Sequence, residues 1–191
     1  MIHQLSEIIA DFLLKKNIIS ETEYDIYTYG YESIMLGIID LLIVLTTGLI
    51  FNEIIAMLLF FIMFILVRIY CGGYHANTVL KCKLIFILIC LCEVNLLKIN
   101  FPWYFHIISM ILYLLSCIFL SPIINENKPL TIEEQTKYKK TSIVLSLIWT
   151  IIAAFFYFFE TKYCTTITIT AFCITLLMVI GKYGKEKKAN G

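Results

Sequence analysis

The chain has 191 residues, of which 60% are apolar and 15% are charged, and its formal net charge is +1. Soluble domains are about 45–50% apolar and about 25% charged, so this composition excludes an ordinary water-soluble domain and indicates a polytopic membrane protein. The near-neutral charge gives no support for nucleic-acid binding. With three prolines, eight glycines and no internal repeat, we expect a single membrane domain over residues 1–191.

Residues 1–30 carry apolar and charged side chains in a helical pattern, without the unbroken apolar core of a cleavable signal peptide. The apolar positions are Ile2, Leu5, Ile8, Ile9, Phe12 and Leu13, with acidic and basic residues opposite them. This pattern predicts an amphipathic helix in the membrane interface or, equally, a short helix packed on the rest of the protein. Ser20 and Glu23 have the spacing of a capping box, which predicts the start of a second interfacial helix.

Six apolar segments follow, each roughly long enough to cross about 30 Å of hydrocarbon as a helix. They cover residues 33–51, 53–70, 83–99, 103–122, 143–160 and 164–181. The third segment is the weakest, because Glu93 and Asn95 interrupt it. We therefore predict an all-α polytopic membrane protein with about six transmembrane helices plus an N-terminal amphipathic interfacial helix.

Lysine and arginine residues predict the orientation, because they are enriched in the cytoplasmic loops of membrane proteins. If the N-terminus is cytoplasmic, thirteen of the fifteen Lys and Arg residues fall inside, and only Lys98 and Lys162 fall outside. We therefore expect a multi-pass protein of the cell membrane, embedded in the lipid bilayer, with both termini in the cytoplasm. Two larger cytoplasmic loops result, over residues 68–83 and 125–142.

The seven cysteines do not indicate a disulfide framework, because their number is odd and most lie in apolar segments. Those in the segments are expected to be small buried apolar side chains, and they are Cys90, Cys92, Cys117 and Cys173. Cys164, at the outer edge of the last segment, is expected to be inert. Cys71 and Cys82 differ, because they lie in the predicted cytoplasmic loop 68–83, where thiols stay reduced.

Cys82 has the features of a catalytic cysteine, which needs a favoured thiolate, a nearby base and access to substrate. Asn77 and Thr78 are good N-cap residues immediately before the third apolar segment, so Cys82 should lie in the first turn or two of a helix. The helix dipole favours a thiolate there, and the charges of Lys81 and Lys83 act in the same direction.

His75 is the histidine nearest to Cys82 in the sequence and the candidate base. In one continuous helix the two residues would stand about 10 Å apart along the axis, too far for a hydrogen bond. If they act together, the chain between them must bend, and Gly72 and Gly73 supply the backbone freedom for a turn. A His–Cys pair is by itself only a weak indication of catalysis.

Arg68, Gly73, His75 and Cys82 follow the pattern R-x4-G-x-H-x6-C within a six-span chain. This pattern resembles the accessory gene regulator B family, AgrB, and the likeness extends from the amphipathic N-terminus to the short basic tail. The resemblance implies a membrane-embedded cysteine endopeptidase of Gram-positive quorum sensing. Such an enzyme cuts the C-terminal part from a pro-peptide, AgrD, and keeps the remainder as a thioester that closes into a thiolactone or lactone ring.

The resemblance also implies a role for each residue of the pattern. Cys82 would be the nucleophile and His75 the general base, with Arg68 and Gly73 supporting activity, in a homodimer that needs no cofactor. Glu32, in the sequence "YGYES", could orient His75 or pair with Arg68, or it could be a solvated carboxylate at headgroup level.

Two other classes of protein are compatible with the sequence. Cys71, His75 and Cys82 offer nitrogen and sulfur ligands for zinc, although a fourth ligand is missing. Asp40 and Glu93 are carboxylates within apolar segments, as in a small transporter or peptide exporter. Such a transporter would keep its activity when Cys82 is lost.

Overall fold

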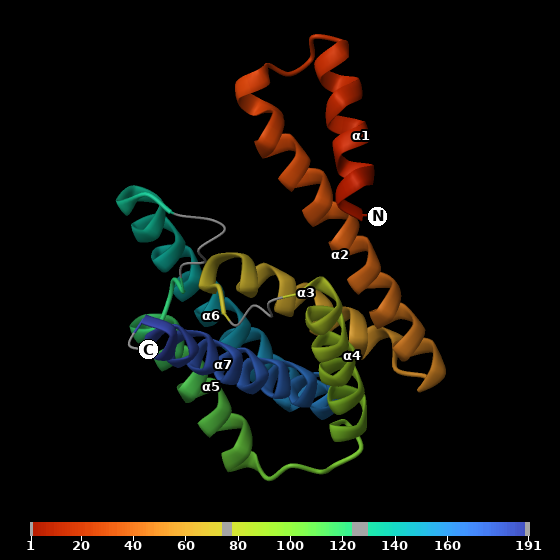
Figure 1. The fold of residues 1–191 in the computed structure, drawn as a ribbon. Helices are drawn as coiled ribbons and strands as arrows, with labels where there is room; N and C mark the ends of the chain where they lie inside the picture. The colour runs from red at the N-terminus through yellow and green to blue at the C-terminus, as the bar shows by residue number, and fades with distance from the viewer. Residues whose placement is uncertain (1, 74–77, 124–129, 190–191) are drawn as a thin grey trace. The chain divides into compact units, whose positions relative to one another are not determined.

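The computed structural model describes residues 2–73, 78–123 and 130–189, and this part of the chain is helical without any strand (Figure 1). The helices are α1 (Ile2–Lys15), the short 3₁₀ helix η1 (Glu21–Glu23), α2 (Tyr24–Ile50), α3 (Ile54–Cys71), α4 (Val79–Leu96), α5 (Trp103–Phe119), α6 (Ile132–Phe159) and α7 (Thr161–Ala189). Each of the six predicted apolar segments forms a helix, which confirms the all-α membrane class.

Within the described ranges, four helical segments are long and apolar enough to cross a membrane. They are Glu21–Ile50, Ile54–Cys71, Ile132–Phe159 and Thr161–Tyr183. Helix α5 is apolar but shorter. Helix α4 is 18 residues long and contains Lys81, Lys83 and Glu93, whereas each of the four long segments includes an 18-residue stretch with at most two charged residues.

Both predicted cytoplasmic loops are partly helical, and their location outside the membrane stays a prediction. The predicted loop 125–142 is helical from Ile132, because Thr131 and Glu134 form a capping box that starts α6. The Thr131 backbone N–H donates to the Glu134 carboxylate (2.9 Å), and the Glu134 N–H donates to the Thr131 hydroxyl (3.2 Å). The two ends of the predicted loop 68–83 are helical as well, because α3 extends to Cys71 and α4 begins at Val79.

Residues up to Ile43 form one compact unit. In it α1 runs antiparallel to the start of α2, and the Tyr24 hydroxyl on α2 donates to the Asp11 carboxylate on α1 (2.9 Å). The predicted capping box is confirmed, since the Ser20 N–H donates to the Glu23 carboxylate (2.9 Å). Helix α2 then continues without a break from the predicted interfacial region into the first predicted span.

A second compact unit begins at Val44 and centres on α7, which contacts α3, α4, α5 and α6. The buried face of α7 is rich in threonine, namely Thr165, Thr166, Thr168, Thr170 and Thr175. Each of these hydroxyls donates to the carbonyl four residues earlier in α7, at 2.7–3.1 Å. The polar atoms on this face are thus bonded within their own helix, as burial requires.

The α2–α3 and α6–α7 turns lie at the same end of this unit. Helix α6 ends at Phe159 and α7 begins at Thr161, and Lys162 pairs with Glu53, which immediately precedes α3. Both turns are predicted to be extracellular, so the ion pair agrees with the predicted order of membrane crossings. Which side of the membrane they face stays a prediction.

Candidate active site beside Arg68 and Cys82

Cys82 lies in the first turn of α4, and its thiol is half-buried. Thr78 is the N-cap: its hydroxyl accepts a hydrogen bond from the Lys81 N–H (3.3 Å), and its carbonyl accepts one from the Cys82 N–H (3.1 Å). The prediction that Asn77 or Thr78 starts this helix is therefore confirmed for Thr78. The N-terminal turn of a helix stabilises negative charge, so the position suits a thiolate.

Helical spacing places Cys82 on the face of α4 that packs against neighbouring helices. The buried residues of this face are Phe86, Cys90, Glu93 and Val94, and Cys82 precedes Phe86 by one turn. The residues on the other side, such as Leu84 and Leu88, are exposed. The Cys82 side chain thus lies at the start of α4, on the side that packs against neighbouring helices.

An aromatic cluster links α4 to α3 next to this position. The ring of Phe86 lies 6.2 Å from that of Phe60 and 5.6 Å from that of Phe64, measured between centroids. The guanidinium of Arg68 lies 5.4 Å from the centroid of the Phe64 ring. Arg68 and Cys82 are therefore each one helical turn from the same cluster, one on α3 and the other on α4.

The Gly72–Gly73 pair changes the direction of the chain after α3. Gly72 has a φ of +71° and Gly73 a φ of +145°, both positive values that L-residues rarely adopt. Gly72 forms a backbone bridge with Ile123, whose N–H donates to the Cys71 carbonyl (2.9 Å). A Cβ on Gly73 would lie 3.7 Å from Nη1 of Arg68, so two residues of the predicted pattern are neighbours.

Gly72 was identified from the sequence only as a source of flexibility, and its close approach to Ile123 was missed. A Cβ at Gly72 would lie 2.3 Å from the Ile123 carbonyl oxygen, so only glycine fits. The sequence around Ile123 contains no pattern that predicts this long-range contact. The bend predicted before Cys82 is thus anchored at its first residue.

His75 and Asn77 lie outside the described residues. The predicted contact between the His75 ring and the Cys82 thiol therefore stays a prediction. The nearest described residues on either side are Gly73 and Thr78.

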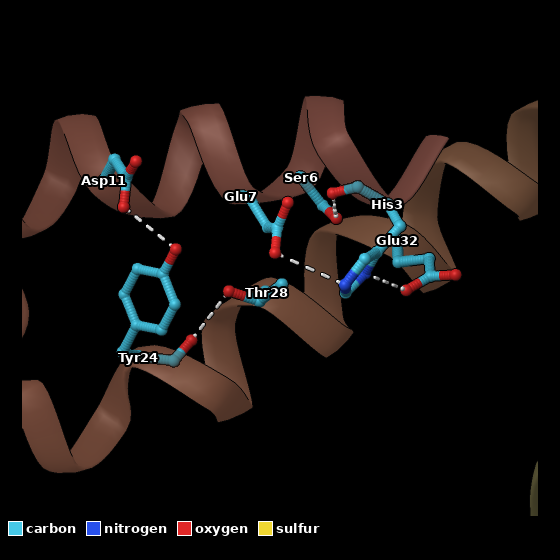
Figure 2. Close-up of polar contacts among 7 residues, drawn as sticks. All are labelled: His3, Ser6, Glu7, Asp11, Tyr24, Thr28 and Glu32. Carbon is cyan, nitrogen blue, oxygen red and sulfur yellow. Dashed lines mark hydrogen bonds and ion pairs between the residues drawn. The ribbon is translucent and has the colours of Figure 1, made fainter. Parts of the chain in front are cut away.

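Glu32 pairs with His3, a partner that was not predicted from the sequence. Nδ1 of His3 on α1 lies 3.2 Å from the Glu32 carboxylate on α2, and Nε2 of His3 lies 3.4 Å from the Glu7 carboxylate (Figure 2). The antiparallel pairing of the two helices brings these groups together, and a single sequence gives little indication of that pairing. A role of Glu32 towards His75 or Arg68 stays a prediction.

The predicted environments of two cysteines are wrong. Cys71 is not a loop residue: it is the last residue of α3, fully buried, with its sulfur 3.7 Å from that of Cys117. Cys92 was expected to be buried but is exposed. The apolar residues of α4 surround the whole helix, so hydropathy alone cannot tell the packed face from the lipid-facing one.

The residues of the two alternative classes were located among the described positions as well. No group of three metal-ligating side chains occurs there, and the zinc hypothesis also depends on His75, which lies outside them. Asp40 is half-buried on α2. Glu93 is fully buried and accepts a hydrogen bond of 3.5 Å from the Thr170 hydroxyl on α7.

A cavity of about 440 Å³ lies among α5, α6 and α7, where it is lined by apolar residues including Trp103, Ile107, Ala153 and Tyr157. Its polar groups include His106 and Thr168, whose Nδ1 and hydroxyl are 3.0 Å apart. Hydropathy gave no sign of this cavity. Neither Arg68 nor Cys82 lines it, so it is separate from the candidate active site.

These observations define an all-α membrane protein in which a half-buried cysteine lies in the first turn of α4, while an arginine and a glycine bend lie at the end of α3, and aromatic rings connect the two helices. The family model for accessory gene regulator B matches residues 6–179. The chain therefore belongs to the AgrB family.

Two curated relatives come from Clostridium perfringens, an AgrB-like protein 2 of strain 13 and an AgrB-like protein of strain SM101. Each is 28% identical to this chain over 163 residues, which cover 78% of this chain and 74% of the relative. No solved structure matches the chain.

Proposed function

We propose that this protein is a membrane-embedded cysteine endopeptidase that processes an AgrD-like pro-peptide. It cuts the C-terminal part from the pro-peptide and promotes closure of the remainder into a thiolactone or lactone ring, the autoinducing peptide of a quorum-sensing system. The enzyme works as a homodimer in the cell membrane of a Gram-positive bacterium, with both termini in the cytoplasm.

The observation that carries the proposal is the position of Cys82. Its thiol is half-buried on the inner face of α4, in a helical turn whose dipole stabilises a thiolate. Arg68 and Gly73, the other described residues of the family pattern, are neighbours at the end of α3. Cys71, by contrast, is fully buried and paired with Cys117, so it is a poor nucleophile.

In the first half of the reaction His75 accepts the proton of the Cys82 thiol. The thiolate attacks the carbonyl carbon of the pro-peptide bond at the carboxyl end of the future ring. The C–N bond then breaks, and His75 returns the proton to the departing amine. The product that stays behind is a thioester between Cys82 and the N-terminal part of the pro-peptide.

In the second half a thiol or hydroxyl of the bound pro-peptide attacks the same carbonyl carbon. The proton of this group passes through His75 to the Cys82 sulfur, which leaves as the thiol. Exchange of one thioester for another is nearly isoenergetic, so the ring forms only if hydrolysis is slow. The ring cluster of Phe60, Phe64 and Phe86 borders the site with apolar surface, which keeps water away from the thioester.

The test is co-expression of the full chain with a candidate pro-peptide, followed by mass spectrometry of the peptide and of the protein. Cys82→Ala and His75→Ala should both abolish cleavage at normal expression. The wild-type protein should carry an acyl group on Cys82 that hydroxylamine removes. Cys92→Ala is the matched control, because Cys92 is an exposed thiol on the same helix and its loss should leave cleavage unchanged.

Continued cleavage by Cys82→Ala would refute the peptidase mechanism. If peptide export also survived in that variant, the transporter hypothesis with Asp40 and Glu93 would replace it. Zinc that co-purifies in stoichiometric amounts, and is lost in Cys82→Ala, would instead favour the metal-binding alternative.

A further inference from the structure

Helix α4 is apolar on every side, although only one side packs against other helices. Phe86, Cys90 and Val94 are buried, whereas Leu84 and Leu88 are exposed. Lipid tails are as apolar as a protein interior, so these residues gain little by facing protein instead of lipid. Their hydrophobicity therefore does not determine which side of α4 turns inward.

Glu93 is the charged residue on the packed side of this helix. Its side chain is only 1% exposed and lies against Thr170 on α7, with 3.5 Å between its carboxylate and the Thr170 hydroxyl. Turning α4 so that Glu93 met lipid would place a carboxyl group in hydrocarbon, which is strongly unfavourable. The buried position of Glu93 thus fixes the rotation of α4 about its axis.

The rotation of α4 also sets the direction of the Cys82 side chain. The two residues are eleven positions apart, which is close to three full turns, so they lie on one face with an offset of about 20°. Phe86 and Cys90 lie between them on that face and are buried. Glu93 and Cys82 are about 16 Å apart along the helix axis. A helix is rigid over this length, so a rotation of α4 about its axis turns both side chains by the same angle.

We propose that Glu93 is a positioning residue that directs the Cys82 thiol towards the bound peptide by fixing the rotation of α4 against α7. Glu93 itself does not touch the substrate, since it lies three turns away from Cys82. This role deepens the proposed peptidase function and depends on it for its catalytic consequence. Its structural part, the direction of the thiol, can be measured without any catalysis.

The first measurement is the alkylation of Cys82 in the full chain reconstituted in liposomes, read by mass spectrometry of the Cys82 peptide. A charged, membrane-impermeant maleimide and the apolar N-ethylmaleimide are used in parallel. In Glu93→Leu the helix loses its rotational constraint. The ratio of the two alkylation rates at Cys82 is therefore expected to change severalfold in the folded protein.

The second measurement is pro-peptide cleavage by the same variants. Misplacing a nucleophile by about 1 Å can lower the rate on the order of 10²-fold, so Glu93→Leu should lower kcat strongly. KM should stay close to the wild-type value, because the peptide contacts are untouched. Glu93→Gln, which keeps a polar side chain of the same shape, should restore both the alkylation ratio and most of kcat.

Asn95→Leu is the matched control, because Asn95 is a polar residue on the exposed side of α4. Its amide donates to the Leu91 carbonyl of its own helix (2.7 Å). This variant should keep the wild-type alkylation ratio and kcat. Thr170→Val, which removes the hydroxyl opposite Glu93, should change the alkylation ratio in the same direction as Glu93→Leu but less.

An unchanged alkylation ratio in folded Glu93→Leu would overturn the proposal, as would an equal change in Asn95→Leu. If Glu93→Leu fails to fold, Thr170→Val provides the test, and an unchanged alkylation ratio in Thr170→Val overturns the proposal. A residue needed only for folding would lower the yield without altering Cys82 in the folded fraction. If Cys82→Ala still cleaves the peptide, the peptidase function fails, while the alkylation result still decides the role of Glu93.

Discussion

Gly72 is the position where one added methyl group would meet the backbone of another segment. Its dihedral angles, φ +71° and ψ −152°, lie in a region that is almost exclusive to glycine and costs another residue about 1–3 kcal/mol. In addition, a Cβ would lie 2.3 Å from the Ile123 carbonyl oxygen, and backbone cannot yield as a flexible side chain does. Gly72→Ala therefore strains the chain and displaces Ile123 as well.

The displacement breaks the hydrogen bond from the Ile123 N–H to the Cys71 carbonyl (2.9 Å), with a net loss of about 0.5–1.5 kcal/mol. Strain and lost bond together should lower the free energy of unfolding by about 2–4 kcal/mol. The midpoint of thermal unfolding in detergent should fall on the order of 10 °C. Pro-peptide cleavage should fall as well, because Gly72 directly precedes Gly73, which is a neighbour of Arg68.

Gly30→Ala is the control, because Gly30 lies within α2 and a Cβ there would meet nothing within 4 Å. Alanine is a better helix former than glycine, so this variant should be unchanged or more stable by about 0.5–1 kcal/mol. The reasoning is refuted if Gly72→Ala unfolds at the wild-type temperature, or if both alanine variants lose the same amount of stability.

Three further predictions concern residues at or near the site. Thr78→Ala should lower the free energy of unfolding by about 1 kcal/mol and slow cleavage, because the N-cap of α4 is lost. Thr78→Ser, which keeps the hydroxyl, should keep the wild-type stability and cleavage rate. Thermal unfolding and mass spectrometry of the peptide measure the two effects. In a variant with no other cysteines, Cys71 and Cys117 should cross-link under mild oxidation, seen as the loss of two free thiols, because their sulfurs are 3.7 Å apart. Persistent free thiols would contradict this contact between the last residue of α3 and α5. Glu32→Gln should change the free energy of unfolding by less than about 1 kcal/mol, because the contact of Glu32 with His3 is an exposed ion pair. A complete loss of cleavage in this stable variant would instead assign Glu32 to the active site.

Helix starts were predictable from the sequence where a polar residue announces them. Thr78 precedes an apolar run and caps α4, and Ser20 and Glu23 form the predicted capping box. Thr131 and Glu134 have the same spacing and start α6, but this capping box was missed, and the helical residues before the predicted span 143–160 were assigned only to a loop. Capping chemistry is thus a better guide to a helix start than hydropathy, which reports only the membrane-crossing part.

Contacts between distant segments were not predictable. The bridge from Gly72 to Ile123 and the pairing of His3 with Glu32 join residues that are far apart in the chain. Hydropathy also failed to separate Cys90, which is buried, from Cys92, which is exposed two residues later on the same helix. An apolar segment in a bilayer has no preferred face unless a polar side chain creates one.

The threonine-rich face of α7 has a consequence for how the protein is assembled. This helix is synthesised after α3, α4, α5 and α6, yet it contacts all four of them. The threonine hydroxyls of α7 are bonded to carbonyls of the same helix. Helix α7 can therefore insert into the lipid before a polar partner helix is in place. The four preceding helices can then gather in the bilayer before α7 docks among them.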